Sequence, residues 1–501
     1  MTNNNPWPAL WALVVGFFMI LIDTTIVSVA NPSIQEGLNT TTTGVIWVTS
    51  AYLLTFAVPL LVTGRLGDMF GPKRIYLVGL TIFTLASLWC GFADTLPGSG
   101  IGNLIAARAV QGLGAALMTP QTMAVITRTF PSAKRGTAMA LWGATAGVAT
   151  LVGPLLGGVL VDGPGWEWIF FVNVPIGVVA FALAWRLVPN LETHVHKMDW
   201  LGIALSSTGM FLVVFGLQEG TENDWNGWVW ASIIGGIVSI TLFILWQRVN
   251  RNEPLLPLEL FKDRNFSLAN AAITTVGFSI TAMFIPTVYF FQVVRGLSPT
   301  ETALMTVPTA LMTLVLARLA GKLTDAVHPR YLAVPGLLLV AFSLWLTAVM
   351  LSPTIPIGWL LIPPTILGLG SAFMWGPISS TATRNLPMKA AGAGSGVYNT
   401  TRQVGAVLGS AAIATLMASR LAANLPEAAI GSESSGLGEL PDALKDGFTA
   451  AMSETLYLPA AVIVVGAVLA YFFVKPAHLR PMGLAESAEE PAGVSPHSTT
   501  I

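Results

Sequence analysis

GRLGDMFGPKR, residues 64–74, is a short charged stretch, rich in glycine, that lies between two long apolar runs. A weaker copy, GKLTDAVHPR, occupies residues 321–330. Glycines allow two helix ends to approach closely, and the charged side chains between them can form a network at a membrane surface. A single copy would be read about equally well as a positively charged anchor. The second copy instead indicates a duplicated membrane protein.

Three further segments recur in the same order in the two halves of the chain. GLGAALMTP (112–120) returns as GLGSAFMWGP (368–377), and FPSAKRGTA (130–138) returns as LPMKAAGAG (386–394), in each case about 256 residues later. VGPLLGG (152–158) has a weaker counterpart in VGAVLGS (404–410). Such self-similarity is typical of secondary transporters, in which two repeats move against each other around a site at their interface.

The composition is that of an integral membrane protein. Apolar residues make up 53% of the chain and charged residues 10%, and the mean hydropathy is +0.70, which is outside the range of ordinary soluble domains. Windows of about 20 apolar residues predict an all-α fold with 14 membrane spans. They cover approximately 9–30, 44–63, 75–94, 103–126, 137–161, 167–188, 200–218, 228–247, 265–291, 301–320, 331–351, 357–378, 392–418 and 455–475.

Basic residues predict the orientation. If both termini are cytoplasmic, only Arg295, Arg420 and Lys445 fall outside, and only Arg108 and Arg402 fall within the hydrophobic core of the membrane. The other Lys and Arg residues then lie on the cytoplasmic side, as the positive-inside rule requires. We therefore expect an inner-membrane protein with an even number of spans. Its net charge of −1 gives no reason to expect a nucleic-acid partner.

The residue inventory argues against enzyme, metal or ATP-driven chemistry. Cys90 is the single cysteine, and the five histidines fall in loops or in the tail, so no intramembrane metal or catalytic cluster is expected. Gly321-Lys322 is followed by leucine, so it does not complete a nucleotide-binding loop. A membrane enzyme or sensor is therefore a remote alternative, and we expect a proton gradient, with no cofactor, to supply the energy.

The repeats divide the chain into two bundles of six helices with two inserted helices. We expect the first bundle at 1–188, the inserted pair with its cytoplasmic linkers at 189–264, and the second bundle at 265–475. The second bundle contains an acidic external segment, 419–454, for which a short helical hairpin and an unstructured loop are both open. The tail, 476–501, is rich in Ala, Pro, Ser and Glu and is expected to be disordered.

Two charged residues interrupt apolar spans in the first bundle. Asp23 lies about 14 residues, or roughly 21 Å, from the cytoplasmic start of its helix, and a carboxylate there either faces a cavity or takes up a proton. Arg108 needs an anionic or carbonyl partner, and Asp23 is a candidate. The alternatives are that Asp23 is a packing element bonded to its threonine neighbours, and that Arg108 only satisfies backbone carbonyls. We expect this pair to carry proton coupling.

Other residues are candidates for the moving parts and for the substrate cavity. The fifth span could be a hinge or a seal because small residues allow close helix contact and a proline bends the helix; its candidates are Gly147, Gly153, Pro154, Gly157 and Gly158. Aromatic, Met and polar residues could line a soft apolar cavity, although core or lipid-facing packing is open for each. These are Trp47, Tyr52, Gln111, Met118, Phe284, Tyr289, Met374, Trp375, Tyr398 and Arg402.

Taken together, the motifs resemble those of the major facilitator superfamily, and among them the 14-helix drug:proton antiporters similar to QacA and EmrB. The resemblance covers the chain to about residue 420 and the last helix. It rests on LIDTTIVSVANPSI (21–34), GRLGDMFGPKR (64–74), RAVQGLGAALMTP (108–120), GATAGVATLVGPLLGG (143–158) and WEWIFFVNVPIG (166–177).

The resemblance implies proton-driven export of lipophilic, often cationic, drugs, dyes or antibiotics by alternating access. It also implies that Asp23 is the membrane-embedded acid, Arg108 the proton-relay arginine and Asp68 a conformational latch. With the repeat, the latch set becomes Gly64, Arg65, Gly67, Asp68, Gly71, Arg74, Asp325 and Arg330. The second copy has lost most of the glycines, so we expect an asymmetric latch.

Two departures from the family pattern refine the expected substrate. Glu167 stands where relatives usually have arginine, which inverts the charge at the external end of the sixth span. The second bundle lacks the extra acids of divalent-cation exporters, which favours monovalent, neutral or zwitterionic substrates. An exporter of an endogenous lipid, siderophore or metabolite without tight proton coupling is the main alternative. We expect a monomer in the lipid bilayer, and the use of a periplasmic adaptor is open.

Overall fold

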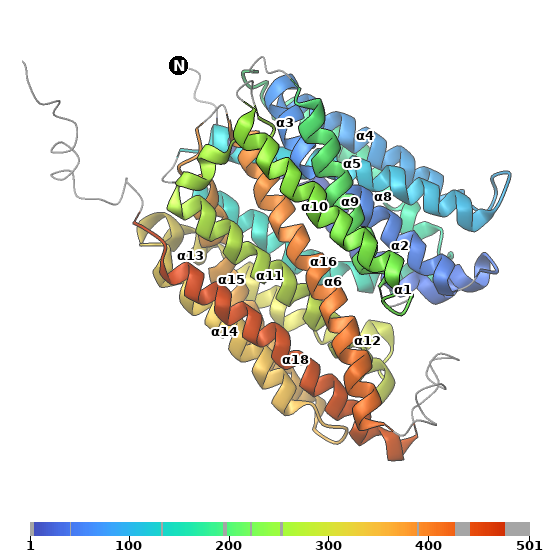
Figure 1. The fold of residues 1–501 in the computed structure, drawn as a ribbon. Helices are drawn as coiled ribbons and strands as arrows, with labels where there is room; N and C mark the ends of the chain where they lie inside the picture. Colours follow the sequence, from blue (N-terminus) through green and yellow to red (C-terminus); the bar gives the residue numbers. More distant parts are fainter. Residues whose placement is uncertain are drawn as a thin grey trace, which may run out of the picture.

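The computed structural model describes residues 5–40, 42–131, 134–193, 198–220, 223–250, 254–387, 390–425 and 441–475. All regular secondary structure in these ranges is helical, and the long helices run roughly alongside one another (Figure 1). Thirteen of these helices are long and apolar enough to cross a membrane, and a bent pair supplies a fourteenth span. The expectation of an all-α protein with 14 spans is therefore confirmed for the described residues.

The first six spans are formed by eight helices. The predicted second span is the bent pair, whose two parts meet at 47°. Pro59 precedes the second part, and a proline cannot donate the backbone hydrogen bond that would continue the first. The predicted sixth span is likewise divided. The helices are α1 (Trp7–Gly37), α2 (Thr42–Ala57), α3 (Leu60–Phe70), α4 (Pro72–Gly91), α5 (Gly100–Thr129), α6 (Arg135–Asp162), α7 (Trp168–Phe171) and α8 (Asn173–Leu187).

The remaining helices form the inserted pair and the second bundle. They are α9 (Trp200–Glu219), α10 (Gly227–Val249), η2 (Leu258–Lys262), α11 (Arg264–Tyr289), η3 (Phe290–Val294), α12 (Pro299–Leu304), α13 (Val307–Ala326), α14 (Arg330–Met350), η4 (Ile357–Leu361), α15 (Ile362–Thr383), α16 (Ala391–Asn424) and α18 (Asp442–Tyr471). Both ends of the expected external segment 419–454 are thus helical extensions of α16 and α18, which corrects its boundaries. Residues 426–440, for which a hairpin or a loop was open, and the tail 476–501, which was expected to be disordered, lie outside the described residues.

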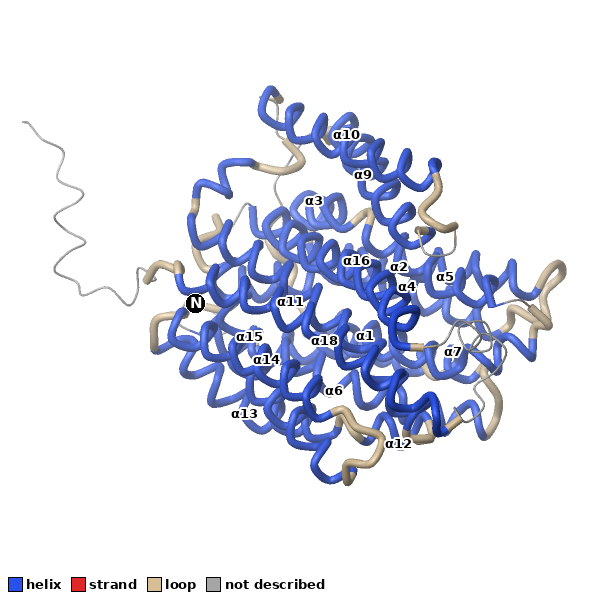
Figure 2. Tube along the Cα trace, turned by 60° about the horizontal axis from the view of Figure 1, so that its bottom comes forward, coloured by secondary structure: helices blue, strands red, loops and turns tan. Residues whose placement is uncertain are grey.

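The inserted helices α9 and α10 pack against each other and lie outside the two bundles, next to α2 and α16 (Figure 2). Asp199 joins the linker to both helices. It accepts hydrogen bonds from the Gly202 amide at 2.9 Å, from the Trp246 indole at 2.8 Å and from the Gln247 amide at 2.6 Å. Burial opposes ionisation, but these hydrogen bonds outweigh it and lower the pKa of Asp199.

The hydrophobic core is shared between the bundles in one half of the molecule and divided in the other. We use the term basic end for the end of the molecule at which α3, with Asp68, terminates. In that half, a single cluster joins Phe17 and Trp142 of the first bundle to Met374 and Tyr398 of the second. In the opposite half, one cluster contains only first-bundle residues, such as Ile26, and another only second-bundle residues. The bundles are therefore closed against each other at the basic end.

Candidate functional site

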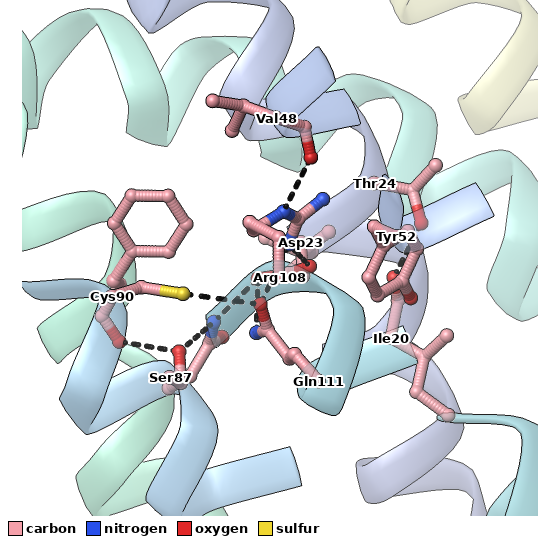
Figure 3. Close-up of polar contacts among 12 residues, drawn as sticks. Ile20, Asp23, Thr24, Val48, Tyr52, Ser87, Cys90, Arg108 and Gln111 are labelled. Carbon is pink, nitrogen blue, oxygen red and sulfur yellow. Dashed lines mark hydrogen bonds and ion pairs between the residues drawn. The ribbon is translucent and has the colours of Figure 1, made fainter. Parts of the chain in front are cut away.

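A buried charged network occupies the first bundle in the half opposite the basic end. Arg108 of α5 donates a hydrogen bond to Oδ2 of Asp23 on α1 at 2.5 Å. Gln111 of α5 and Asn173 of α8 donate to the other carboxylate oxygen at 2.8 and 2.9 Å. Arg108 also donates through Nε to the Val48 carbonyl at 3.3 Å. Figure 3 shows Asp23, Arg108 and Gln111 together, with the backbone carbonyl oxygen of Val48 directed at the arginine.

A second layer of polar and aromatic groups fixes this arrangement. Ser87 accepts from Asn173 at 3.0 Å and donates to the Phe170 carbonyl at 3.0 Å. The Tyr52 ring lies 4.1 Å from the Arg108 guanidinium carbon, within the range of a cation–π contact. Asp23, Arg108, Gln111 and Asn173 are all fully buried. Each charge therefore has an opposite charge and several donors or acceptors, as burial in an apolar medium requires.

The structure pairs the two residues that the sequence singled out and adds others. The ion pair between Asp23 and Arg108 is present, and the alternative contact to a backbone carbonyl is present beside it. Asn173 was missed as a site residue although it lies in the quoted WEWIFFVNVPIG motif, because a neutral amide in an apolar span gives no charge signal. Ser87 gave no signal either. Gln111 and Tyr52 belong to this network rather than to a cavity wall.

We expect Asn173→Ala to weaken the network. Loss of a hydrogen bond to a charged group costs about 1.5–3 kcal/mol, so the purified variant should melt at a lower temperature and transport should fall. Asn103→Ala is the matched control, because the Asn103 amide donates to the Ala93 carbonyl near the start of α5, at 3.3 Å. A thermal melt and transport equal to wild type in Asn173→Ala would contradict the importance of this contact.

Asp68 makes a contact between the bundles that the sequence alone could not locate. The charged stretch that the sequence placed between two spans is largely helical, because residues 64–70 form the end of α3. The Asp68 carboxylate accepts hydrogen bonds from the backbone amides of Gly392 and Ala393, at 3.0 and 2.9 Å, in the first turn of α16. It also forms an ion pair with Arg128. A carboxylate at a helix N-terminus is stabilised by the helix dipole and by unpaired amides. Buried Arg65 interacts electrostatically with the same carboxylate.

The second copy of the motif, whose residues 321–326 lie at the end of α13, makes the equivalent contact from the second bundle to the first. Asp325 accepts from the amides of Gly136 and Thr137, at 2.8 and 3.1 Å, in the first turn of α6. The Thr137 hydroxyl donates to it at 2.8 Å. Arg384 lies 3.7 Å from Asp325, in the position that Arg128 has beside Asp68. The expected asymmetry is therefore limited to a looser arginine contact, because both carboxylates cap the first turn of a helix in the opposite bundle.

Glycines allow these helices to meet. A Cβ atom at Gly64 would lie 2.5 Å from the Gly392 carbonyl, and one at Gly321 would lie 2.6 Å from Thr137 Cα. Gly67 packs against Gln121, and Gly71 ends α3 with a φ of 90°, which favours glycine. The close contacts of Gly64 with Gly392 and of Gly321 with Thr137 therefore join the two bundles at the basic end.

Two predicted latch residues do not belong to the latch. Arg330 is half-buried and donates to its neighbour Tyr331 at 2.9 Å, and Arg74 is exposed on α4. Both arginines lie at the start of the next helix, and the arginines that pair with Asp68 and Asp325 are instead Arg128 and Arg384. Their inclusion rested on the motif alone.

Helix α6, the predicted hinge, is a continuous helix that forms a seam with the second bundle. Gly147 faces Thr313 of α13, where an added Cβ atom would lie at 3.4 Å, and Gly158 faces Thr300 of α12 at 2.8 Å. Gly153 instead packs against Thr25 of α1. Pro154, Gly157 and Gly158 are buried. The small residues thus allow α6 to contact the second bundle on one side and α1 on the other, as a seal between the bundles requires. A hinge in α6 stays a prediction.

The ten predicted cavity residues do not lie in one place. Met374, Trp375 and Tyr398 belong to the core cluster shared by the two bundles. The same cluster contains Phe17 and Trp142, which the sequence did not single out and whose ring centroids lie 4.7 Å apart in a stacked arrangement. Met118 is fully buried in the core of the first bundle, so its assignment to the cavity is corrected. The others are separate: Trp47 packs on Phe215 of α9, Phe284 and Tyr289 are exposed on α11, and Arg402 lies in α16.

Comparison with known proteins agrees with the fold. Residues 13–410 match the model of the Major Facilitator Superfamily. An uncharacterized MFS-type transporter of Mycobacterium tuberculosis is 52% identical over 94% of this chain and 81% of its own length. The tetracenomycin C resistance and export protein of Streptomyces glaucescens is 31% identical over 94% of this chain and 92% of its own.

Two further matches bear on family and fold. The multidrug resistance protein Stp of M. tuberculosis is 33% identical over 84% of this chain and 78% of its own length. The solved structure of the proton:xylose symporter XylE, 13% identical, covers 95% of this chain and 97% of its own with a TM-score of 0.65. The chain belongs to the major facilitator superfamily, and it is a multi-pass membrane transporter rather than an enzyme.

Proposed function

We propose that the chain is a proton-coupled exporter of lipophilic small molecules, working by alternating access across the inner membrane. The observation that carries the proposal is the Asp23 network. A carboxylate with a buried cation and two amide donors can lose or gain a proton only when the surrounding helices let water reach it. Proton exchange at Asp23 is thereby tied to the conformational cycle.

The contacts at the basic end supply the other half of the cycle. Asp68 and Asp325 hold each bundle to the first turn of a helix in the other, so they stabilise the conformer closed at that end. We place that end, and both termini, on the cytoplasmic side because it gathers the basic residues. The drug and antibiotic export functions named for the relatives support export as the direction of transport. All of these parts lie within one chain, so a monomer can do the work.

Two measurements test this proposal together. A panel of dyes, drugs and antibiotics should identify compounds to which the protein gives resistance in a host that lacks its own exporters. In everted vesicles with an acidic interior, those compounds should release protons from the vesicle lumen. Resistance without any proton movement would favour the alternative exporter of an endogenous metabolite, and no transport of any compound would refute export.

A further inference from the structure

Arg402 of α16 is a cation without a partner in the part of the chain that the structure describes. It lies eleven residues after the start of its helix at Ala391, which is about 16 Å into the membrane. Its Nε atom is buried and has no hydrogen-bond acceptor. Arg108, by contrast, has a carboxylate, an amide and a carbonyl around it.

No acid of the second bundle can serve as the missing partner. The sequence between Glu301 and Glu427 contains one acidic residue, Asp325, and that carboxylate is bound to α6 at the basic end. Helix α11 also lacks Asp and Glu. The acids of α18 lie in the half of that helix far from the basic end, where Glu454 pairs with Arg420, and Glu301 caps α12. Asp23 is already neutralised by Arg108. Among the described residues, Arg402 is therefore a positive charge in the membrane region that no carboxylate compensates.

The groups around Arg402 are also short of hydrogen-bond partners. Tyr398 lies four residues earlier, hence on the same side of α16, and interacts with Arg402 electrostatically. The Tyr398 side chain is fully buried. Its hydroxyl, which has only the Ser379 side chain beside it, and the Asn399 amide oxygen are buried without a hydrogen bond, as is the Trp142 indole nitrogen in the core cluster that contains Tyr398. Unpaired buried groups of this kind are costly, and native proteins commonly satisfy them with a ligand or water.

We infer that Arg402 and Tyr398 form a binding site for the acidic group of a lipophilic aromatic acid, a carboxylate or phenolate. An arginine fork is suited to a planar acid group, and the tyrosine hydroxyl can donate a further hydrogen bond to it. The aromatic part of the ligand would meet the shared cluster, which contains Tyr398 and the stacked pair Phe17 and Trp142. This names a substrate class for the proposed exporter and rests on that proposal only for the direction of transport.

An acidic substrate takes the place of the cationic substrate that the family resemblance led us to expect. A cation would need a free carboxylate to bind it, and Asp23 is occupied by Arg108 in this conformer. A lipophilic cation would instead meet the uncompensated charge of Arg402 in a medium of low dielectric constant, where like charges repel strongly.

The test is binding of three probes that share one ring system. 9-Anthracenecarboxylate, 9-anthracenecarboxamide and 9-(aminomethyl)anthracene carry a negative, zero and positive charge at neutral pH. Their binding to the purified full chain in detergent can be followed by quenching of tryptophan emission. We expect the carboxylate to bind at least about tenfold more tightly than the amide, as a charge-assisted hydrogen bond allows.

Variants test whether the preference for the carboxylate probe arises at Arg402 and Tyr398. Arg402→Gln should remove it, Arg402→Lys should keep part of it, and Tyr398→Phe should weaken it. Arg318→Gln is the control because Arg318 is exposed on α13. If Arg402→Gln fails to fold, Arg402→Lys and Tyr398→Phe still show whether the preference for the carboxylate probe depends on this site.

Equal affinity for the three probes, no binding of the carboxylate, or an unchanged preference in these variants would overturn the inference. Binding in detergent needs no proton gradient, so the proposed export function can fail while the charge preference stands. Conversely, proton-coupled transport of neutral or cationic compounds with no charge preference at Arg402 would leave the proposed function in place and remove the acid site.

Discussion

Replacing Asp23 with asparagine should abolish substrate-driven proton movement in vesicles. The asparagine cannot take up and release a proton in the working pH range, and it leaves Arg108 buried without a counter-charge. Removing one partner of a buried ion pair costs about 3–5 kcal/mol, so a loss of stability is expected as well. Proton flux should fall to the level of empty vesicles, and a thermal melt should report the destabilisation.

The double variant Asp23→Asn/Arg108→Gln separates these two effects. It removes both charges, and a buried pair replaced by neutral groups is often tolerated, so the double variant should melt closer to wild type than the single one. Its proton flux should nevertheless remain absent. A stable double variant that still moves protons when substrate is added would contradict the assignment of coupling to Asp23.

Replacing Asp68 with asparagine should reduce transport about tenfold or more while leaving membrane insertion intact. The change removes the negative charge from the first turn of α16, where it is worth up to about 2 kcal/mol, and leaves Arg128 buried without its ion pair. Because this contact exists only when the bundles meet at the basic end, the loss acts on the balance between conformers. Initial transport rates in vesicles with matched protein amounts measure it.

Asp325→Asn should act in the same direction, because Asp325 makes the equivalent contacts with α6. Asp162→Asn is the control: Asp162 is exposed at the other end of α6 and should leave transport unchanged. Wild-type transport rates in a well-inserted Asp68→Asn variant would contradict the latch and leave the 64–74 segment as a positively charged anchor.

Two kinds of feature could be predicted from the sequence: charged residues that interrupt an apolar span, and segments that are repeated in the two halves of the chain. Asp23 and Arg108 stood out because each interrupts a span and each needs a partner, and the structure places them together. The repeated loop was recognised as a contact between halves. Its binding partner was not, because Gly392 lies 324 residues from Asp68 and a backbone amide has no sequence signature.

Neutral residues were placed less well for a related reason. The identity of Met118 or Tyr52 does not say which face of a helix is turned inward, and both kinds of face are apolar in a membrane protein. Asn173 and Ser87 hydrogen-bond within the charged network, but a short polar side chain in a span is common. Only the packing of α4, α5 and α8 around α1 shows that they contribute.

The core shared by the two bundles at the basic end has a thermodynamic consequence. Opening that end separates Phe17 and Trp142 from Met374 and Tyr398 and exposes apolar surface to water or to substrate. Exposure of apolar surface raises the heat capacity. The balance between the two conformers therefore varies with temperature along a curve rather than a straight line, and an apolar substrate that covers this surface flattens the curve.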